Sequence, residues 1–291
     1  MIVDMTSETN RATPAETRAD ITRLSARGYT QLRQVLVQLP DTEDPRASTL
    51  ARMLSERKHR PLLLYIMLLT CWPWLEDRRE PLPGGFWVRA LTAPGAPTWS
   101  PSTLSRSWGE LEELGLITKP EKREGRLMRP TPRREDGAVV EGGGVPYDAP
   151  GGRRDRCNTY FALPDEFWTE EIFAKLSLPA LVMLLLVAKE TQSKPEVWLT
   201  YDRIEDWYGI KQKSAQNGLT DLRKAGLLHR RIEEVKTTFS ATGSTVHMWY
   251  SLKGPFGREA RLALQDRAAK ERKKRLKRAA RAKNTPPKEQ P

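Results

Sequence analysis

An apolar stripe with helical spacing occurs twice along the chain, and the second copy follows the first after 111 residues. Within each copy the apolar or small residues recur every three or four positions, and a glycine stands near the end. The copies comprise Leu104, Trp108, Leu111 and residues 114–117, and Ala215, Leu219, Leu222 and residues 225–228. Such spacing is typical of an amphipathic helix, and glycine commonly follows the last helical turn. The sequence therefore predicts two equivalent helices, each followed by a strand-like segment.

A uniformly apolar segment precedes each stripe. Residues 62–72 and 180–190 are largely apolar on all sides, and Pro61 or Pro179 stands in the first turn of the predicted helix. Proline is well tolerated in a first helical turn, and a helix without a polar face is normally buried. We therefore expect two interior helices, one for each repeated stripe.

The order of elements is clearest in the second half of the chain. The predicted elements are a strand at 197–199, a helix over 201–208 between Thr200 as its cap and Gly209 as its turn, a helix over 211–225, and a hairpin of 227–239 and 245–252 with its tip at 240–244. Serine and threonine favour the N-cap position, and a Gly-containing tip between strand-like segments favours a hairpin.

The first half follows the same order less clearly. Its repeated helix begins with Ser100 as N-cap and Pro101 at the first helical position, whereas residues 86–93 fit either a strand end or a short helix. Residues 158–163 resemble 247–252, so we interpret them as the return strand of the first hairpin. The Gly/Pro-rich residues 135–157 would then be a long insertion at the tip of that hairpin.

The segments outside the two repeats are predicted to be helical or disordered. Amphipathic helices are expected over residues 14–39, interrupted at Gly28, and over 46–58. The predicted division is 1–58 for a disordered start with amphipathic helices, 59–163 for a first unit that includes the insertion, 164–254 for a second unit, and 255–291 for a basic helical tail with a disordered end. Residues 14–58 fit either dimerisation or packing against the first unit.

The charge of the chain points to a polyanionic partner. The formal net charge is +12 and the isoelectric point is about 9.8. Residues 258–283 carry twelve Lys and Arg against three acidic residues, which leaves about +3 for the rest of the chain. A basic surface attracts nucleic acid. The tail has a thin apolar face without Trp or Phe, which favours nonspecific phosphate contact over membrane binding.

Other sequence features indicate the cellular compartment in which the protein is expected. The two cysteines, Cys71 and Cys157, lie in an apolar run and a polar loop, so no disulfide framework is expected. The first residues are polar, unlike a signal peptide, and the longest apolar runs have about half the length of a membrane span. We therefore expect a cytoplasmic protein without membrane contact.

Together, the buried helix after a proline, the glycine-ended helix and the basic hairpin resemble a winged helix-turn-helix unit, and the chain has two of them. The resemblance covers roughly residues 60–253. Among such proteins, the chain resembles the replication initiators of bacterial plasmids and mobile elements. This resemblance implies a mainly α fold with small β-hairpins (α+β), binding of repeated double-stranded DNA sites, and recruitment of a helicase or other replication proteins. A homodimer is compatible with it.

A winged helix places its last helix in the major groove, so the polar side of each stripe predicts the DNA contacts. In the second unit these residues are Lys211, Gln212, Lys213, Ser214, Asn217 and Lys224, with Arg230, Arg231 and Lys236 on the hairpin. In the first unit they are Ser102, Thr103, Arg106 and Ser107, with Lys119, Lys122, Arg123 and Arg126 on the hairpin. The second unit is expected to read bases, and the first to depend more on its basic hairpin.

Enzymatic chemistry is not expected. His59, His229 and His247 lack the spacing of metal ligands, and the chain contains no phosphate-binding loop and no nucleophile elbow. His229 and His247 fit a cross-strand pair of the hairpin with a structural role. We expect no catalytic residue, metal or cofactor.

Two alternatives to a replication initiator remain. One is a transcriptional regulator with the same fold, and the other is a protein-docking scaffold that touches nucleic acid only through its basic tail.

Overall fold

The computed structural model describes residues 11–41, 43, 46–78, 80–119, 130–137, 147–151 and 156–283. Two apolar helices lie in its interior, α3 (His59–Leu75) and α8 (Leu178–Glu190). All residues from Pro61 to Trp72 are buried, and so are Leu178 and residues 180–188. The prediction of two interior helices is confirmed, because neither helix has a polar face that could meet water.

The second unit contains one three-stranded sheet and two further helices. Its elements after α8 are β5 (Val197–Trp198), α9 (Tyr201–Tyr208), α10 (Gln212–Lys224), β6 (Leu228–Lys236) and β7 (Ser244–Leu252). The central strand is β7, which pairs antiparallel with both β5 and β6. Thr200 caps α9, and Gly209 ends it with a φ of 67°. These elements were all predicted within one or two residues of their ends, except that β6 ends at Lys236 and not at the predicted residue 239.

The first unit has a shorter hairpin. Its elements after α3 are α4 (Gly84–Leu91), α5 (Pro101–Glu113), β2 (Ile117–Thr118) and β3 (Thr131–Pro132). The Ser100 side chain accepts a hydrogen bond from the Thr103 backbone N–H, and Pro101 opens α5, as predicted. The open choice for residues 86–93 is settled as a helix. Because β2 pairs with β3, the return strand of the first hairpin is β3.

The assignment of residues 158–163 to the first hairpin is therefore wrong, and residues 135–157 follow that hairpin instead of forming an insertion at its tip. The strand there, β4 (Tyr160–Pro164), pairs antiparallel with β1 (Tyr29–Arg33), and the register joins Leu32 to Phe161. This pairing also corrects the prediction of helix for residues 29–33. The apolar spacing of that segment fits a helix or a strand, and pairing with a distant strand, which no local pattern reveals, decides between them.

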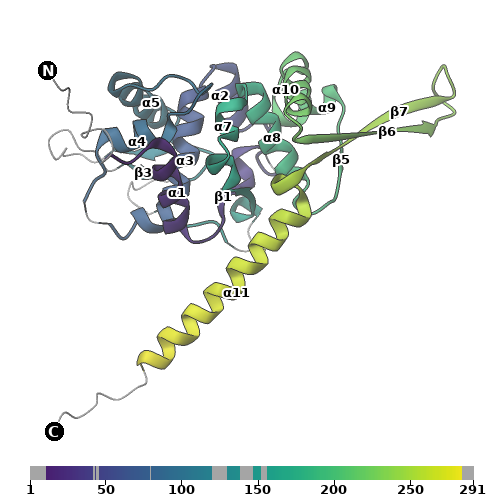
Figure 1. Ribbon diagram of the computed structural model, residues 1–291. Helices are drawn as coiled ribbons and strands as arrows, with labels where there is room; N and C mark the ends of the chain where they lie inside the picture. Colours follow the sequence, from purple (N-terminus) through teal and green to yellow (C-terminus); the bar gives the residue numbers. More distant parts are fainter. Residues whose placement is uncertain are drawn as a thin grey trace, which may run out of the picture.

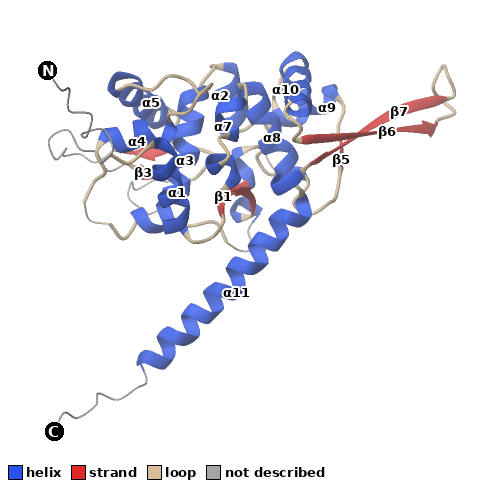
Figure 2. Ribbon diagram, viewed as in Figure 1, coloured by secondary structure: helices blue, strands red, loops and turns tan. Residues whose placement is uncertain are grey.

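Short elements complete the chain. The N-terminal helix α1 (Pro14–Ser25) has a capping box between Thr13 and Glu16, and α2 (Thr49–Ser55) lies inside the range predicted for it. The remaining elements are η1 (Gln34–Leu36), η2 (Arg156–Asn158), α6 (Glu166–Thr169), α7 (Ile172–Lys175), η3 (Gly254–Phe256) and α11 (Arg258–Lys283). Figure 2 shows helices as the main component, with small sheets between and beside them.

One continuous core of buried apolar residues runs from the N-terminal helices to the second unit. A buried ion pair ties β1 to the segment after the first hairpin, because Arg33 Nη1 lies 2.8 Å from Glu135 Oε2. The Tyr147 hydroxyl donates to the same carboxylate at 2.7 Å. Two elements extend from this body, the β6–β7 hairpin and α11, and they project in different directions (Figure 1).

Candidate nucleic-acid interface

Helix α10 packs one side tightly against α8 and leaves the other side open. Ala215, Gly218, Leu219 and Leu222 are buried. A Cβ atom on Gly218 would lie 2.3 Å from the Pro179 carbonyl oxygen, so the two backbones approach as closely as glycine allows. Most of the residues predicted to face DNA are exposed, namely Lys211, Gln212, Lys213, Asn217 and Lys224, and Ser214 is half-buried.

The start of α10 presents positive charge and free polar groups. Lys211 occupies the N-cap without a side-chain hydrogen bond to the first turn, so it leaves those backbone N–H groups to other acceptors. A helix N-terminus of this kind favours an anion such as phosphate. Gln212 donates to Asp202 at 2.9 Å, and Lys213 to Gln216 at 3.2 Å. No hydrogen bond joins the Asn217 side-chain amide to another described residue.

Helix α5 has a smaller polar side than the sequence predicts. Ser102 and Arg106 are exposed, whereas Thr103 is half-buried and accepts a hydrogen bond from the Ser100 backbone N–H at 2.8 Å. Ser107 is only 2% exposed, and its hydroxyl donates to the Thr103 carbonyl. The prediction that Ser107 contacts DNA is therefore wrong, because the residue lies between Leu104 and Leu111 on the buried side.

The first hairpin contributes one described cation. Lys119 Nζ lies 2.5 Å from Glu112 Oε2 of α5, so its charge is partly neutralised within the protein. Glu110, on the same helix, pairs with Lys58 at 3.1 Å. The other cations predicted on this hairpin, Lys122, Arg123 and Arg126, lie outside the described residues.

The second hairpin exposes three cations, and ion pairs hold one of them. Arg230 and Lys236 are exposed. Arg231 Nε lies 3.0 Å from Glu196 and its Nη1 lies 3.2 Å from Glu233, and these hydrogen bonds raise the pKa of the guanidinium. Arg230 and Lys236 are thus better placed than Arg231 to contact phosphate. The predicted pairing of His229 with His247 is wrong, because the register joins His229 to Ser251 and Glu233 to His247.

An aromatic stack that the sequence reasoning missed connects α9 to the sheet. The Arg203 guanidinium lies 4.2 Å from the Trp198 ring centroid and 4.6 Å from that of Trp207. On the sheet, the His247 ring stacks on Trp198 at 4.1 Å. The spacing of Arg203 and Trp207 by one helical turn is the only local signal for it. The stack therefore ties α9, the helix before α10, to β5 and β7 of the sheet.

Helix α11 is anchored by a buried arginine. Arg261 is completely buried, and its guanidinium donates to carbonyl oxygens of Ala188, Thr191 and Phe256 and to the side chains of Thr191 and Gln192, at 2.8–3.1 Å. Burial lowers the pKa of Arg261 to about 10, so the group stays charged at neutral pH. The C-terminal part differs sharply, since residues 270–278 are all exposed and seven of the nine are Lys or Arg.

The relative positions of these surfaces are visible in Figure 1. Helices α5 and α10 both lie along the upper side of the body, and the β6–β7 hairpin extends outward beside α10. The free end of α11 points away from that side. Any duplex lying along α5 and α10 would therefore meet the hairpin before it met the end of α11.

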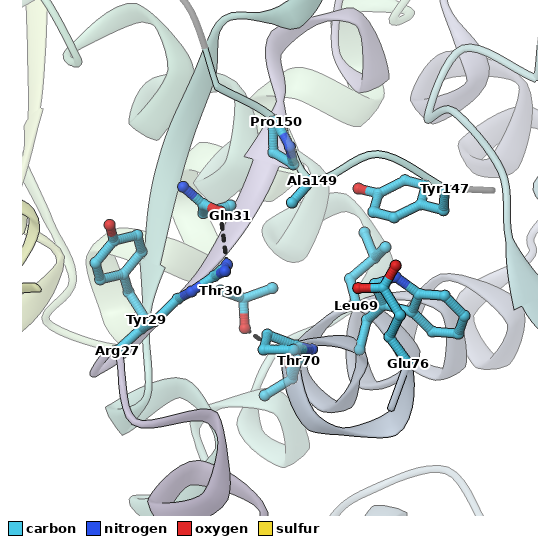
Figure 3. Close-up of a pocket in the computed structure, with 12 residues that line it drawn as sticks. Arg27, Tyr29, Thr30, Gln31, Leu69, Thr70, Glu76, Tyr147, Ala149 and Pro150 are labelled. Carbon is cyan, nitrogen blue, oxygen red and sulfur yellow. Dashed lines mark hydrogen bonds between the residues drawn. The ribbon is translucent and has the colours of Figure 1, made fainter. Parts of the chain in front are cut away.

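The described hollows measure about 80 to 560 Å³, and the smallest is the one between β1 and α3. A cavity of about 80 Å³ lies between β1, α3 and residues 147–150 (Figure 3). Small-molecule sites usually measure about 300–1,000 Å³. Its polar groups are largely paired within the protein, Arg27 with Gln31 at 2.6 Å and Thr30 with Thr70 at 2.7 Å.

Metal-binding groups and membrane-spanning helices are both absent from the described residues. These residues contain no group of three or more His, Cys, Asp or Glu residues that could hold a metal ion. Among the same residues, no helix has the length and apolar character needed to cross a membrane. Comparison of the chain with protein-family models, with curated proteins and with solved structures gives no match, so inference about its function rests on sequence and geometry.

Proposed function

We propose that the chain binds double-stranded DNA through two winged-helix units in tandem and serves in the initiation of plasmid or mobile-element replication. The proposal rests on the order and pairing of the elements in the second unit. There a helix, a strand, two helices and a hairpin follow in order, and the first strand pairs with the last. This arrangement is the one expected of a winged helix.

The exposed side of α10 supports binding in the major groove. In helix-turn-helix proteins the second helix enters that groove with its N-terminal residues toward the bases. Here Gly209 forms the turn between α9 and α10, and Lys211, Lys213 and Asn217 lie at the exposed start of α10. Asn can form two hydrogen bonds with adenine, and Lys reaches guanine or phosphate. The free amide of Asn217 makes it the first candidate for base reading.

The first unit supports a second, weaker contact with the same duplex. Its elements α3, α4, α5, β2 and β3 follow the order of the second unit except for the first strand, and its repeated helix has the same length of 13 residues. The exposed side of α5 offers Arg106, but also Glu112 and Glu113. We expect this unit to contact phosphates rather than to read bases, and two adjacent units suit repeated origin sites.

The proposal is tested by selection and mutation. The full chain is used to select duplexes from a random pool, and binding of the selected duplex and of a scrambled duplex is then measured. Asn217→Ala is expected to weaken binding to the selected duplex about 10-fold and to leave the scrambled duplex unchanged. Thr22→Ala on α1, away from α10, is the matched control. Equal losses on both duplexes, or no loss, would contradict base reading by α10.

A further inference from the structure

The tip of the β6–β7 hairpin carries a fully exposed aromatic side chain. Phe239 is 98% exposed, the highest exposure among the large apolar residues that the structure describes. Burying a Phe side chain is worth roughly 1.5–3 kcal/mol, and the body of the protein gains none of this at Phe239. The hairpin carries the residue well away from the core (Figure 1). Phe239 is therefore available to a partner.

The loop that holds Phe239 is fixed by its own hydrogen bonds. The Thr237 backbone N–H donates to the Gly243 carbonyl at 2.9 Å, and the Gly243 N–H donates to the Ser240 carbonyl at 3.1 Å. The Ser240 hydroxyl donates to the Ser244 carbonyl at 2.8 Å. Gly243 has a φ of 74°, which glycine adopts without strain. These bonds close the loop and present Phe239 in a defined place, so ordering it on binding costs little.

The charge around the tip suits a nucleic-acid partner. Residues 236–244 contain one lysine and no acidic residue. The two nearest carboxylates are engaged, since Glu233 pairs with Arg231 and Glu234 accepts a hydrogen bond from Ser244 at 2.5 Å. The tip itself thus presents an apolar ring among hydroxyl groups, with Lys236 beside it and no carboxylate within residues 236–244.

The hairpin is long enough to reach from one groove of a duplex to the next. The nine residues of β6 span about 26 Å at roughly 3.3 Å per residue. The major and minor grooves of B-DNA are about 12 and 6 Å wide, so a hairpin that starts beside a helix in the major groove reaches the adjacent minor groove. Proteins that enter the minor groove frequently insert apolar wedges such as Phe between base steps and kink the duplex.

We propose that Phe239 is such a wedge, which enters the minor groove and unstacks one base step when α10 lies in the neighbouring major groove. The proposal rests on the proposed DNA-binding function and adds a mechanical step to it. Local unstacking is a first stage of opening a duplex, so the wedge would link recognition by α10 to melting at one fixed distance from it.

The test uses duplexes with 2-aminopurine, an adenine analogue whose fluorescence rises on unstacking, at successive positions. The probe is the duplex recovered by selection with the full chain, or a random-sequence duplex of the same length if none is enriched. The full chain is expected to raise fluorescence at one or two adjacent positions. Phe239→Ala is expected to remove this rise and to weaken binding about 10-fold, whereas Phe239→Trp retains both.

Ile232→Ala is the matched control, because Ile232 is an apolar residue of the same hairpin with 57% exposure and lies away from the tip. It is expected to leave the fluorescence rise intact. If Phe239→Ala binds and unstacks like the wild type, or if Ile232→Ala loses the rise equally, the wedge is wrong while DNA binding stands. If the wild type binds no duplex, both the wedge and the proposed function are overturned.

Discussion

Ser107 of α5 and Gly218 of α10 occupy the same position in two helices, 111 residues apart, and both are buried. Each is a small residue on the side of its helix that packs toward the apolar helix before it. The Ser107 hydroxyl turns back to the Thr103 carbonyl, and Gly218 has no side chain at all, next to the Pro179 carbonyl. Both units therefore place a small residue at the same buried position of the repeated helix, and at Gly218 it lets two helices approach closely.

Replacing Gly218 tests this close approach. A Cβ atom in Gly218→Ala would lie 2.3 Å from backbone oxygen, so the helices must move apart. We expect the free energy of unfolding to fall by about 1–3 kcal/mol, although Ala favours helix by about 1 kcal/mol over Gly. Urea denaturation measures the change. Gln216→Ala, at an exposed position two residues earlier, should stay within about 0.5 kcal/mol, and equal stability of the two variants would contradict tight packing at Gly218.

The sequence predicted the repeated parts of the fold well, because their signals are local. The spacing from Leu104 to Leu111, the cap at Ser100 and the stop at Gly209 each act within one or two helical turns. The pairing of β1 with β4 was missed because it joins residues more than 120 positions apart. Ser107 was misplaced for a different reason: a small polar residue fits either side of a helix until the neighbouring helix is known.

The candidate interface was predictable to a similar degree. The exposed side of α10 follows from periodicity alone. The pairs of Arg231 with Glu196 and of Lys119 with Glu112 do not, since these partners lie 35 and seven residues apart, whereas Glu233 lies only two residues from Arg231. The prediction that Phe239 lies in the first strand of the hairpin is wrong, because β6 ends at Lys236 and Phe239 lies in the loop at the tip, where it is 98% exposed.

The buried ion pair between Arg33 and Glu135 provides a second prediction. Both side chains are at most 4% exposed, and Arg33 also donates to Asn158 at 2.9 Å. Arg33→Met leaves the Glu135 carboxylate buried without its cation, so we expect a loss of about 3–5 kcal/mol in unfolding free energy. Arg33→Met combined with Glu135→Leu should recover part of this loss, because no buried charge remains. Denaturant titration of the single and double variants measures the two free energies of unfolding. If the double variant is no more stable than Arg33→Met, the unpaired Glu135 charge is not the cause of the lost stability.

The carboxyl group of Asp165 predicts a pH dependence of stability. Burial, with the nearby Glu166 carboxylate, raises its pKa from an ordinary 3.8 to about 7, although Arg267 of α11 opposes the shift. A carboxyl group with a raised pKa favours folding fully below its unfolded pKa, and this contribution is lost as the pH rises through the folded pKa. Asp165→Asn should therefore gain stability relative to the wild type as the pH rises from about 4 to beyond 7.

The comparison with the wild type at each pH is needed because His59 acts in the opposite direction. Burial lowers the pKa of His59 to about 4, so both proteins lose stability as the pH falls from about 6.5 toward 4. That loss cancels in the difference between the two proteins. Thermal unfolding at several pH values gives the difference, and a difference that does not change between pH 4 and 8 would show that Asp165 titrates normally.

The exposed part of α11 predicts how DNA affinity depends on salt. Residues 270–283 contain nine Lys and Arg against one Glu, and the one ion pair described within them joins Lys274 to Glu271. Each phosphate contact contributes a slope of about 0.9 to the dependence of log affinity on log salt, so a chain ending at Ala269 should lose roughly 4 from the slope when about half of these nine cations contact phosphate. Its sequence preference should stay unchanged, since the selective contacts are assigned to α10.

A chain ending at Lys283 is the matched control, because residues 284–291 carry one Lys and one Glu and no net charge. Binding measured by fluorescence anisotropy between about 50 and 200 mM salt gives each slope. Equal slopes for the two shortened chains would mean that α11 does not contact phosphate, whereas loss of sequence preference in the shorter one would mean that α11, rather than α10, selects the site.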